Sequence, residues 1–315
     1  GPFKLAEEGN SAVLVANLVA ARPPKISEVR VISAGSPALA AEMVRLMGDS
    51  VTFELPRFDS AIASVEFGAR RLDATRTRLE MIVYDPAGSP LADANVRRAF
   101  DLAIDRAELF APSEGGRPGA APVSRRSPFY PKDLAPGRSA EGARGALVSA
   151  GWTLEPGKGA TRKNAAGSSE TLTIPLLLDA DDPEALRRAA VIKQRSAEVG
   201  IVIELDPRPR IEFLDRVRSR QFPAALVGQE GGLDDQLRAL FHSGGMLNEL
   251  GWSFPEVDAA LDSGDSAAAV AAILRTVPAV FLGVRADVGA TGKNVVAPQV
   301  LGRGGLQRVD KWQIR

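Results

Sequence analysis

The chain has 315 residues, with 39 Lys and Arg, 39 Asp and Glu, one His and no Cys. Its length predicts one to three domains of roughly 100–200 residues each. The zero formal net charge argues against an extended nucleic-acid surface, which needs excess Lys and Arg. The absence of Cys excludes disulfides, thiolate nucleophiles and zinc ribbons.

The first part of the chain is expected to alternate short strands with helices. It opens Gly1-Pro2-Phe3, without an initiator Met or a signal peptide, which predicts a processed or truncated product. Ser36-Pro37 is typical of a helix start, because Ser caps and Pro fits the first turn. The expected elements are strands at Ala12–Ala16, Val29–Ile32, Val51–Leu55 and Leu79–Tyr84, a helix from Pro37 to Gly48, and a shorter helix near Ser60–Phe67.

The strongest helical pattern begins at Asp93, a capping residue, and is expected to run to about Leu109. Residues 111–138 are rich in Pro, Gly, Ser and Arg, and are predicted to form a long surface loop. This loop either binds a partner or wraps the domain. The side chains that would contact a partner are Arg125, Arg126, Phe129 and Tyr130, which offer charge and aromatic surface.

The second half of the chain is expected to form parallel strands joined by helices. A hairpin beginning at Trp152 should return in the strand Leu172–Leu178. From there the order is strand, helix, strand, helix, strand, which implies right-handed crossovers. The further elements are a helix capped by Asp182 and running to Val199, strand Ile201–Leu205, helix Ile211–Arg220, strand Ala224–Val227, helices Asp234–Phe241, Pro255–Leu261 and Ser266–Arg275, and strand Ala279–Val284; Ser253 and Glu256 form a predicted capping box.

Residues for catalysis or metal binding are few. His242 is the only histidine, and no Gly-x-Ser-x-Gly elbow is present, so no catalytic residue is assigned. With one His and no Cys, a transition-metal site is not expected. The acids of Asp179–Asp182 suit a hard cation, but Asp182 is better explained as a helix cap. No cofactor is predicted.

Several short segments match, in order, the motifs of one protein family. The longest runs from Pro90 to Phe100 and continues to Arg106; it is similar to P-F-x-D-x-R-V-R-x-A-x-x-x-A-I-D-R. The others are Gly1–Leu5, Val15–Asn17 with Pro23–Ile26, Leu46–Val51, Leu240–Ser243 and Ser253–Asp258. Together they resemble extracytoplasmic solute-binding proteins of family 5, the oligopeptide, dipeptide and nickel-binding type.

The resemblance implies an α/β fold of the two-lobed, periplasmic-binding-protein-like type II class, with one lobe complete and the other partial. Residues 1–83 and 282–315 would belong to lobe I, and residues 84–281 would form lobe II. Tyr84 and Phe281 would lie near the hinge. The resemblance also implies that the chain is the later part of such a protein, without an N-terminal portion.

The ligand of such a protein lies between the lobes, near the carboxyl ends of the strands. By this resemblance, the ligand-binding residues are Glu230, Asp234, Asp235 and His242, which follow strand Ala224–Val227. Peptide-binding members carry W-x-x-D-x-x-D-P-D-x-F here, whereas this chain has Gly228–Leu237 without the Trp. The expected ligand is a small solute or a glycolipid headgroup, and ordinary peptide capture is in doubt.

The resemblance therefore predicts a non-catalytic, extracytoplasmic binding protein. The Ala- and Arg-rich composition suggests a high-GC actinobacterium. Within the family, the loss of the peptide-anchoring residues resembles a lipoprotein subtype of such bacteria that is associated with phosphatidylinositol mannoside and lipoarabinomannan synthesis. The alternative is the substrate-binding component of an ABC transporter for peptides or other solutes. The expected partners are an envelope protein or an ABC permease, and the membrane through an N-terminal lipid anchor that is absent from this chain.

Overall fold

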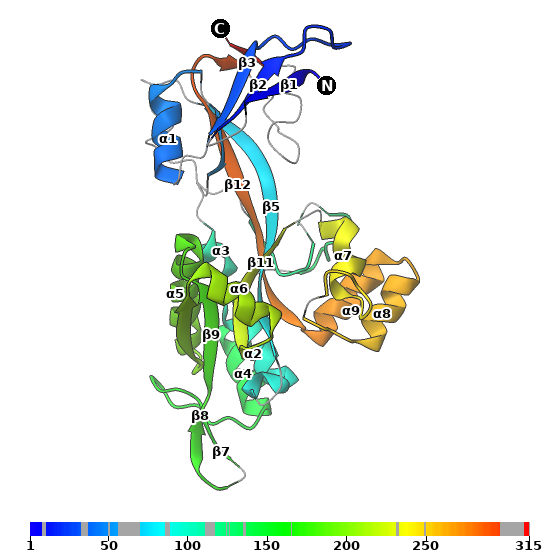
Figure 1. The fold of residues 1–315 in the computed structure, drawn as a ribbon. Coiled ribbons are helices and arrows are strands. Elements are labelled where there is room, and N and C mark those ends of the chain that lie inside the picture. The colour runs from blue at the N-terminus through cyan, green and yellow to red at the C-terminus, as the bar shows by residue number, and fades with distance from the viewer. Residues whose placement is uncertain are drawn as a thin grey trace. The chain divides into compact units, whose positions relative to one another are not determined.

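The computed structural model describes residues 1–7, 11–32, 37–49, 51–55, 70–85, 89–110, 117–123, 125, 127–134, 137–164, 166–230, 233–248, 250–296 and 312–314. The chain divides into two compact units (Figure 1). Unit 1 contains residues 1–77, 112–116 and 285–315, and unit 2 contains residues 78–111 and 117–284. None of the helices in the described ranges has the length and hydrophobicity of a membrane span.

Unit 1 is built from short antiparallel ladders. Its elements are β1 (Phe3–Glu7), β2 (Ser11–Ala16), β3 (Glu28–Ile32), α1 (Pro37–Leu46), β4 (Val51–Leu55), β13 (Val295–Val296) and β14 (Gln313–Ile314). The first three strands form one sheet in the order β1-β2-β3, and β13 pairs with β14. A small core gathers around Trp312, with Ile26 and Val295 buried against it.

Unit 2 contains a mixed sheet covered by helices on both faces. Its strands are β5 (Arg70–Tyr84), β6 (Arg117–Pro118), β7 (Thr161–Lys163), β8 (Ser169–Thr171), β9 (Thr173–Asp179), β10 (Val202–Arg208), β11 (Ala224–Glu230) and β12 (Ala279–Thr291). Its helices are η1 (Pro90–Ala92), α2 (Ala94–Ala103), α3 (Arg106–Leu109), α4 (Ala140–Ser149), α5 (Pro183–Ala197), α6 (Arg210–Arg218), α7 (Leu233–Phe241), α8 (Pro255–Asp262) and α9 (Ser266–Thr276). Strands β5 and β12 begin or end in unit 1, where β12 pairs with β4.

The sheet order is β10-β9-β11-β5-β12. Strands β10 and β11 both run parallel to β9, as the sequence predicted, whereas β11 and β5 are antiparallel. Successive side chains of β5 point to opposite faces of the sheet. Ile82 and Tyr84 therefore join the first hydrophobic core, whereas Leu79, Met81 and Val83 join the second.

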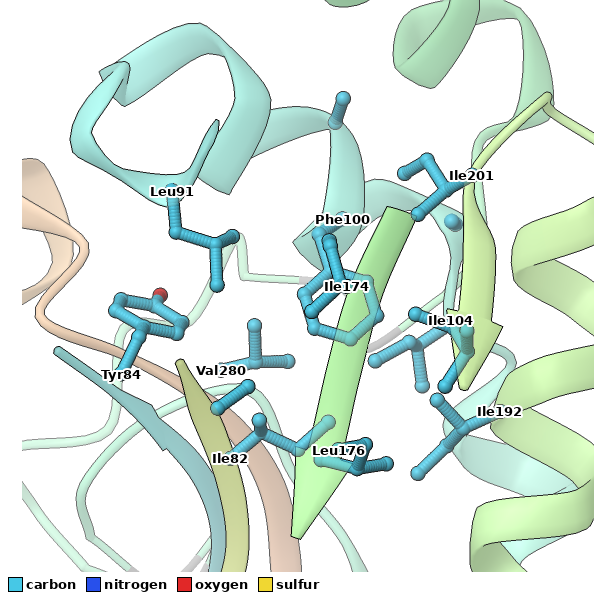
Figure 2. Packing of buried hydrophobic residues seen from close by; sticks show 14 of the residues in the cluster. Ile82, Tyr84, Leu91, Phe100, Ile104, Ile174, Leu176, Ile192, Ile201 and Val280 are labelled. Carbon is cyan, nitrogen blue, oxygen red and sulfur yellow. The ribbon is translucent and has the colours of Figure 1, made fainter. Parts of the chain in front are cut away.

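The first core lies under α2, α4 and α5. Phe100 and Ile104 from the α2 segment meet Leu176 of β9 and Ile192 of α5 (Figure 2). The second core lies under α6 to α9 and includes Phe241, whose ring stacks on Trp252 with centroids 5.0 Å apart. The two cores therefore lie on opposite faces of the sheet.

Several sequence predictions need correction. The helix from Asp93 to Leu109 is two helices, because Ile104 is extended and the Asp105 side chain accepts from Ala107 N to begin α3. The capping box before α8 is wrong: the N-cap is Phe254, and it makes no side-chain cap bond.

The predicted hairpin is also different. Its paired strands are β7 and β8, and β9 instead joins the large sheet beside β10 and β11. Strand β5 is longer than the predicted Leu79–Tyr84. The predicted helix near Ser60–Phe67 lies outside the described residues.

Candidate ligand-binding site

The candidate site is the edge of the unit 2 sheet where β9, β10 and β11 end, which we call the carboxyl edge. The chain leaves β9 for α5, whose Ala189 and Ile192 join the first core. It leaves β10 for α6, whose Phe213 joins the second core. Adjacent strands thus send their connections to opposite faces, and in open α/β sheets ligands bind at such a switch point.

Buried charge gathers at this edge. Four ionisable residues there are less than a tenth exposed: Glu80 (5%), Asp179 (7%), Glu184 (6%) and Arg188 (0%). Asp179 ends β9, and its Oδ2 lies 3.0 Å from Nη2 of Arg210 at the start of α6. Buried charges are costly unless they are paired. We call this group of buried charged residues at the carboxyl edge the ionic layer.

Glu80 and Arg188 form the most enclosed pair of this layer. Oε2 of Glu80 lies 3.9 Å from Nη1 of Arg188. Nε of Arg188 donates to the Leu109 carbonyl at 3.1 Å, and its guanidinium lies 4.9 Å from the centre of the Phe110 ring. Sequence reasoning missed both residues. A signal was present for Glu80, which is a single acid within the apolar run Leu79–Tyr84.

Three of the four predicted ligand residues lie at the end of β11 and in the helix that follows it. Glu230 is the last residue of β11 and lies opposite Arg78 of β5. Asp234 and Asp235 are in the first turn of α7. The backbone therefore brings these three positions to the carboxyl edge, and their side chains lie outside the described part of the structure. Their role in binding stays a prediction.

His242 lies at the other end of α7. The helix has nine residues, so it separates His242 from the carboxyl edge by about 13 Å. Its Nδ1 accepts from Gly244 N at 2.9 Å, and its Nε2 lies 3.3 Å from Oδ1 of Asp262. A hydrogen bond from Arg238 lowers the pKa of the Asp262 carboxyl, and His242 lowers it further. These contacts join α7 to α8, and ligand binding by His242 stays a prediction.

The predicted partner surface lies on the loop that follows α3. Arg125 is exposed, and Arg126 lies outside the described residues. Phe129 and Tyr130 are half-buried and pack against the second core. The Tyr130 hydroxyl accepts from Ala120 N at 3.2 Å. Phe129 and Tyr130 therefore cover part of the second core. Among the four predicted partner residues, Arg125 is the described one that is exposed.

Asp182 caps α5, as predicted, by accepting from Glu184 N and Ala185 N at 3.0 and 3.3 Å. Its neighbour Asp181 accepts from Arg210 N at 2.9 Å. Within the described ranges, no group of three or more His, Cys, Asp or Glu residues could hold a metal ion.

Two arginines of the longest motif, Arg97 and Arg106, bind the protein's own backbone. Arg97 donates to the carbonyls of Leu91 and Ala92 in η1, both at 3.0 Å, and to the Val277 carbonyl after α9 at 3.1 Å. Arg106 is 2% exposed; it donates to the Phe281 carbonyl of β12 at 2.6 Å and pairs with Asp101. These residues join the α2 segment to the start of β12.

The fold is that of solute-binding proteins with known structures. The oligopeptide-binding protein AppA of Bacillus subtilis, solved with a nonapeptide, matches 100% of this chain and 66% of its own, with 19% identity and a TM-score of 0.74. NikA of Brucella suis, solved with Fe(III)-EDTA, matches 100% of this chain and 68% of its own, with 15% identity and a TM-score of 0.78. The predicted α/β, periplasmic-binding-protein-like fold is confirmed, and the chain covers about two thirds of each structure.

A curated relative is Protein XP55 of Streptomyces lividans, which is 28% identical over 228 residues. The match covers 69% of this chain and 40% of that protein. The family model for bacterial extracellular solute-binding proteins, family 5 middle, matches residues 1–246. The chain belongs to this family, and the predicted resemblance is confirmed.

Proposed function

We propose that the chain is part of the substrate-binding component of an ABC transporter and that it takes a peptide or another small solute outside the cytoplasm. The family match over residues 1–246 is the observation that carries this proposal. The carboxyl edge of unit 2 supports it, because it joins a topological switch point to a layer of buried charge. The proposed protein is non-catalytic and binds through Glu230, Asp234, Asp235 and the residues around them.

We further propose that unit 2 is lobe II and that unit 1 is part of lobe I. The units divide within β5, between Thr77 and Arg78, and within β12, between Val284 and Arg285. Two strands that pass from one unit to the other are suited to a hinge, since a few residues in each can absorb a rotation.

The test is to identify the solute and follow its uptake. The full-length protein is purified without denaturation from its own envelope, and native mass spectrometry measures any bound mass. We expect a peptide or small solute that is released on unfolding. Uptake of the same isotope-labelled solute should fall when the gene is deleted. A protein that carries no solute, in a strain whose uptake is unchanged, would contradict the proposal.

A second candidate is a role in envelope glycolipid synthesis, similar to that associated with the mycobacterial lipoprotein LpqW, with anchoring through an N-terminal lipid. The observation that favours it is the segment Gly228–Leu237, which lacks the Trp of peptide-binding members. Its partner would be a glycolipid headgroup or an envelope protein near Arg125. A gene deletion that alters lipoarabinomannan and leaves solute uptake unchanged would favour this candidate over the transporter.

A further inference from the structure

Met246 is the most exposed of the large hydrophobic residues that the structure describes, with an exposed fraction of 87%. It lies in the loop that joins α7 to α8 (Figure 1). Reagents that oxidise methionine act first on thioethers that the solvent reaches. The exposure of Met246 therefore makes its sulfur a candidate for covalent modification.

The backbone on both sides of Met246 is held by hydrogen bonds. Gly245 N donates to the His242 carbonyl at 2.8 Å, and Leu247 N donates to the Ala239 carbonyl at 2.9 Å. These bonds tie the loop to the end of α7, so Met246 lies between two anchored neighbours.

The side chain of Asn248 closes the same loop. Its Nδ2 donates to the carbonyls of His242 and Trp252, at 3.0 and 2.7 Å. Its Oδ1 accepts from Trp252 N at 2.8 Å. One amide thus joins the beginning of the loop to its end, and the exposure of Met246 belongs to a loop of defined shape.

The neighbours of Met246 fill the inner side of the loop. Leu247 packs against the second core. A Cβ atom at Gly245 would lie 2.3 Å from the Ala239 carbonyl oxygen, so the backbone at this glycine already touches α7. The Met246 side chain therefore extends into the solvent.

The chain has four methionines, and the other three are less exposed. Met81 of β5 is 3% exposed and belongs to the second core. Met47, which follows α1, is 49% exposed, and Met43 of α1 is half-buried. The protein thus contains internal controls, because it has one open thioether, one enclosed thioether and two between these extremes.

We propose that Met246 is a modification site at which peroxides oxidise the thioether to a sulfoxide. The sulfur attacks one oxygen of the peroxide, the O–O bond breaks, and a sulfur–oxygen bond forms. The sulfur is oxidised and the peroxide is reduced; the remaining peroxide oxygen takes up the proton and leaves as water or an alcohol. The product is polar and chiral where the thioether was apolar.

The exposure of Met246 also predicts what the modification leaves unchanged. Oxidation of a core methionine disrupts packing, because a polar oxygen enters an apolar space. At Met246 water supplies the hydrogen bonds of the new oxygen, so the stability of the fold should not change. The modified protein then has the same fold and a polar group in place of an apolar one on this loop.

Peptide mapping by mass spectrometry tests the site in the full-length protein during exposure to dilute hydrogen peroxide. We expect Met246 to gain one oxygen faster than Met47, and about tenfold or more faster than Met81. In urea, where the chain is unfolded, the rates should become nearly equal. A rate at Met246 no higher than that at Met47 in the folded protein overturns the proposal. A rate at Met246 that stays above the others in urea also overturns it, because the fold would then not be the cause.

Met246→Leu keeps an apolar side chain of similar size and removes the thioether. The fast phase of oxygen gain, followed on the intact protein, should be lost in this variant. Met47→Leu is the matched control and should keep the fast phase. A fast phase that persists in Met246→Leu overturns the assignment. A lower melting temperature of wild-type protein oxidised at Met246 alone overturns the expected independence of the fold.

Discussion

Val277 shows how one residue can hold an unfavourable conformation. It has φ of 46° and ψ of 56°, a left-handed geometry that is costly for a β-branched side chain. Its carbonyl accepts from the hydroxyl of Tyr84 and from Nε of Arg97, both at 3.1 Å. Burial raises the pKa of Tyr84 well above its usual range, so this hydroxyl stays a donor at neutral pH.

Arg97→Met tests the contribution of this cluster of hydrogen bonds. The variant removes the arginine's hydrogen bonds to four carbonyls, those of Leu91, Ala92, Thr276 and Val277, of which Val277 keeps the bond from Tyr84. Hydrogen bonds to a charged group contribute about 1.5–3 kcal/mol each, and they are not additive within one cluster. We expect urea denaturation to show a loss of roughly 2–4 kcal/mol.

Arg98→Met is the control, because Arg98 is the adjacent arginine and is exposed. Its expected effect is within about 0.5 kcal/mol, as for most surface substitutions. Equal losses in the two variants would show that the carbonyl contacts of Arg97 add nothing to stability.

At the scale of elements, a network of charges ties α3 to the end of α5. Nε of Arg195 donates to Glu108 at 2.8 Å, and its Nη1 donates to Glu198 at 2.6 Å. Arg138 also donates to Glu198 at 2.6 Å. The hydrogen bonds from Arg195 lower the pKa of both carboxyls. The network therefore contributes most when these carboxyls are ionised.

The lowered pKa values set the direction of a pH effect. The unfolded carboxyls bind protons at a higher pH than the folded ones, so this stability is present above about pH 5 and is lost as the pH falls further. Arg195→Met should make the fall of urea stability between pH 5 and pH 3 less steep, and added salt should act in the same direction. Lys193→Met, on the exposed side of α5, is the control. An identical pH profile in Arg195→Met would contradict the prediction.

Elements with strong local signals could be predicted from the sequence, and those set by distant contacts could not. Asp182 and Pro183 place the start of α5 because capping is local. Arg106, which follows the break at Ile104, donates to Phe281, 175 residues away in sequence, and a local pattern does not predict that contact. The predicted Ser253 cap fails because Pro255 begins α8 and makes Phe254 the N-cap.

The place of the candidate site in the fold could be predicted more readily than the residues that form it. The alternation of strands and helices is enough to place Glu230, Asp234 and Asp235 at a strand end. The pairing of Glu80 with Gly228 depends on an antiparallel register between strands more than a hundred residues apart, which periodicity alone does not define. The inward contacts of Phe129 and Tyr130 likewise depend on a core built from later helices.

At the scale of the whole molecule, β5 and β12 belong to both units, so a loss of packing along either strand should affect both. Leu282 of β12 and Leu147 of α4 are both fully buried in the first core. Replacing either by Ala should cost about 2–5 kcal/mol. Only Leu282→Ala is expected to weaken unit 1 as well, because its strand continues there.

Hydrogen exchange with mass spectrometry measures this difference. Amides of β9 report on unit 2, and amides of β2 report on unit 1. We expect faster exchange in β9 for both variants, and faster exchange in β2 for Leu282→Ala alone. Equal exchange in β2 for the two variants would show that strand continuity does not couple the units.

The internal bonds of Arg97 and Arg106 have a consequence for how such proteins diversify. Both arginines lie in the longest family motif. The contacts described for them are with helices and a strand of the protein itself, at a distance from the carboxyl edge in the fold. A signature built from scaffold bonds identifies the architecture without specifying the cargo. Mutation can therefore alter residues of the carboxyl edge while the motif and its contacts stay unchanged, so one architecture can be kept while other positions vary.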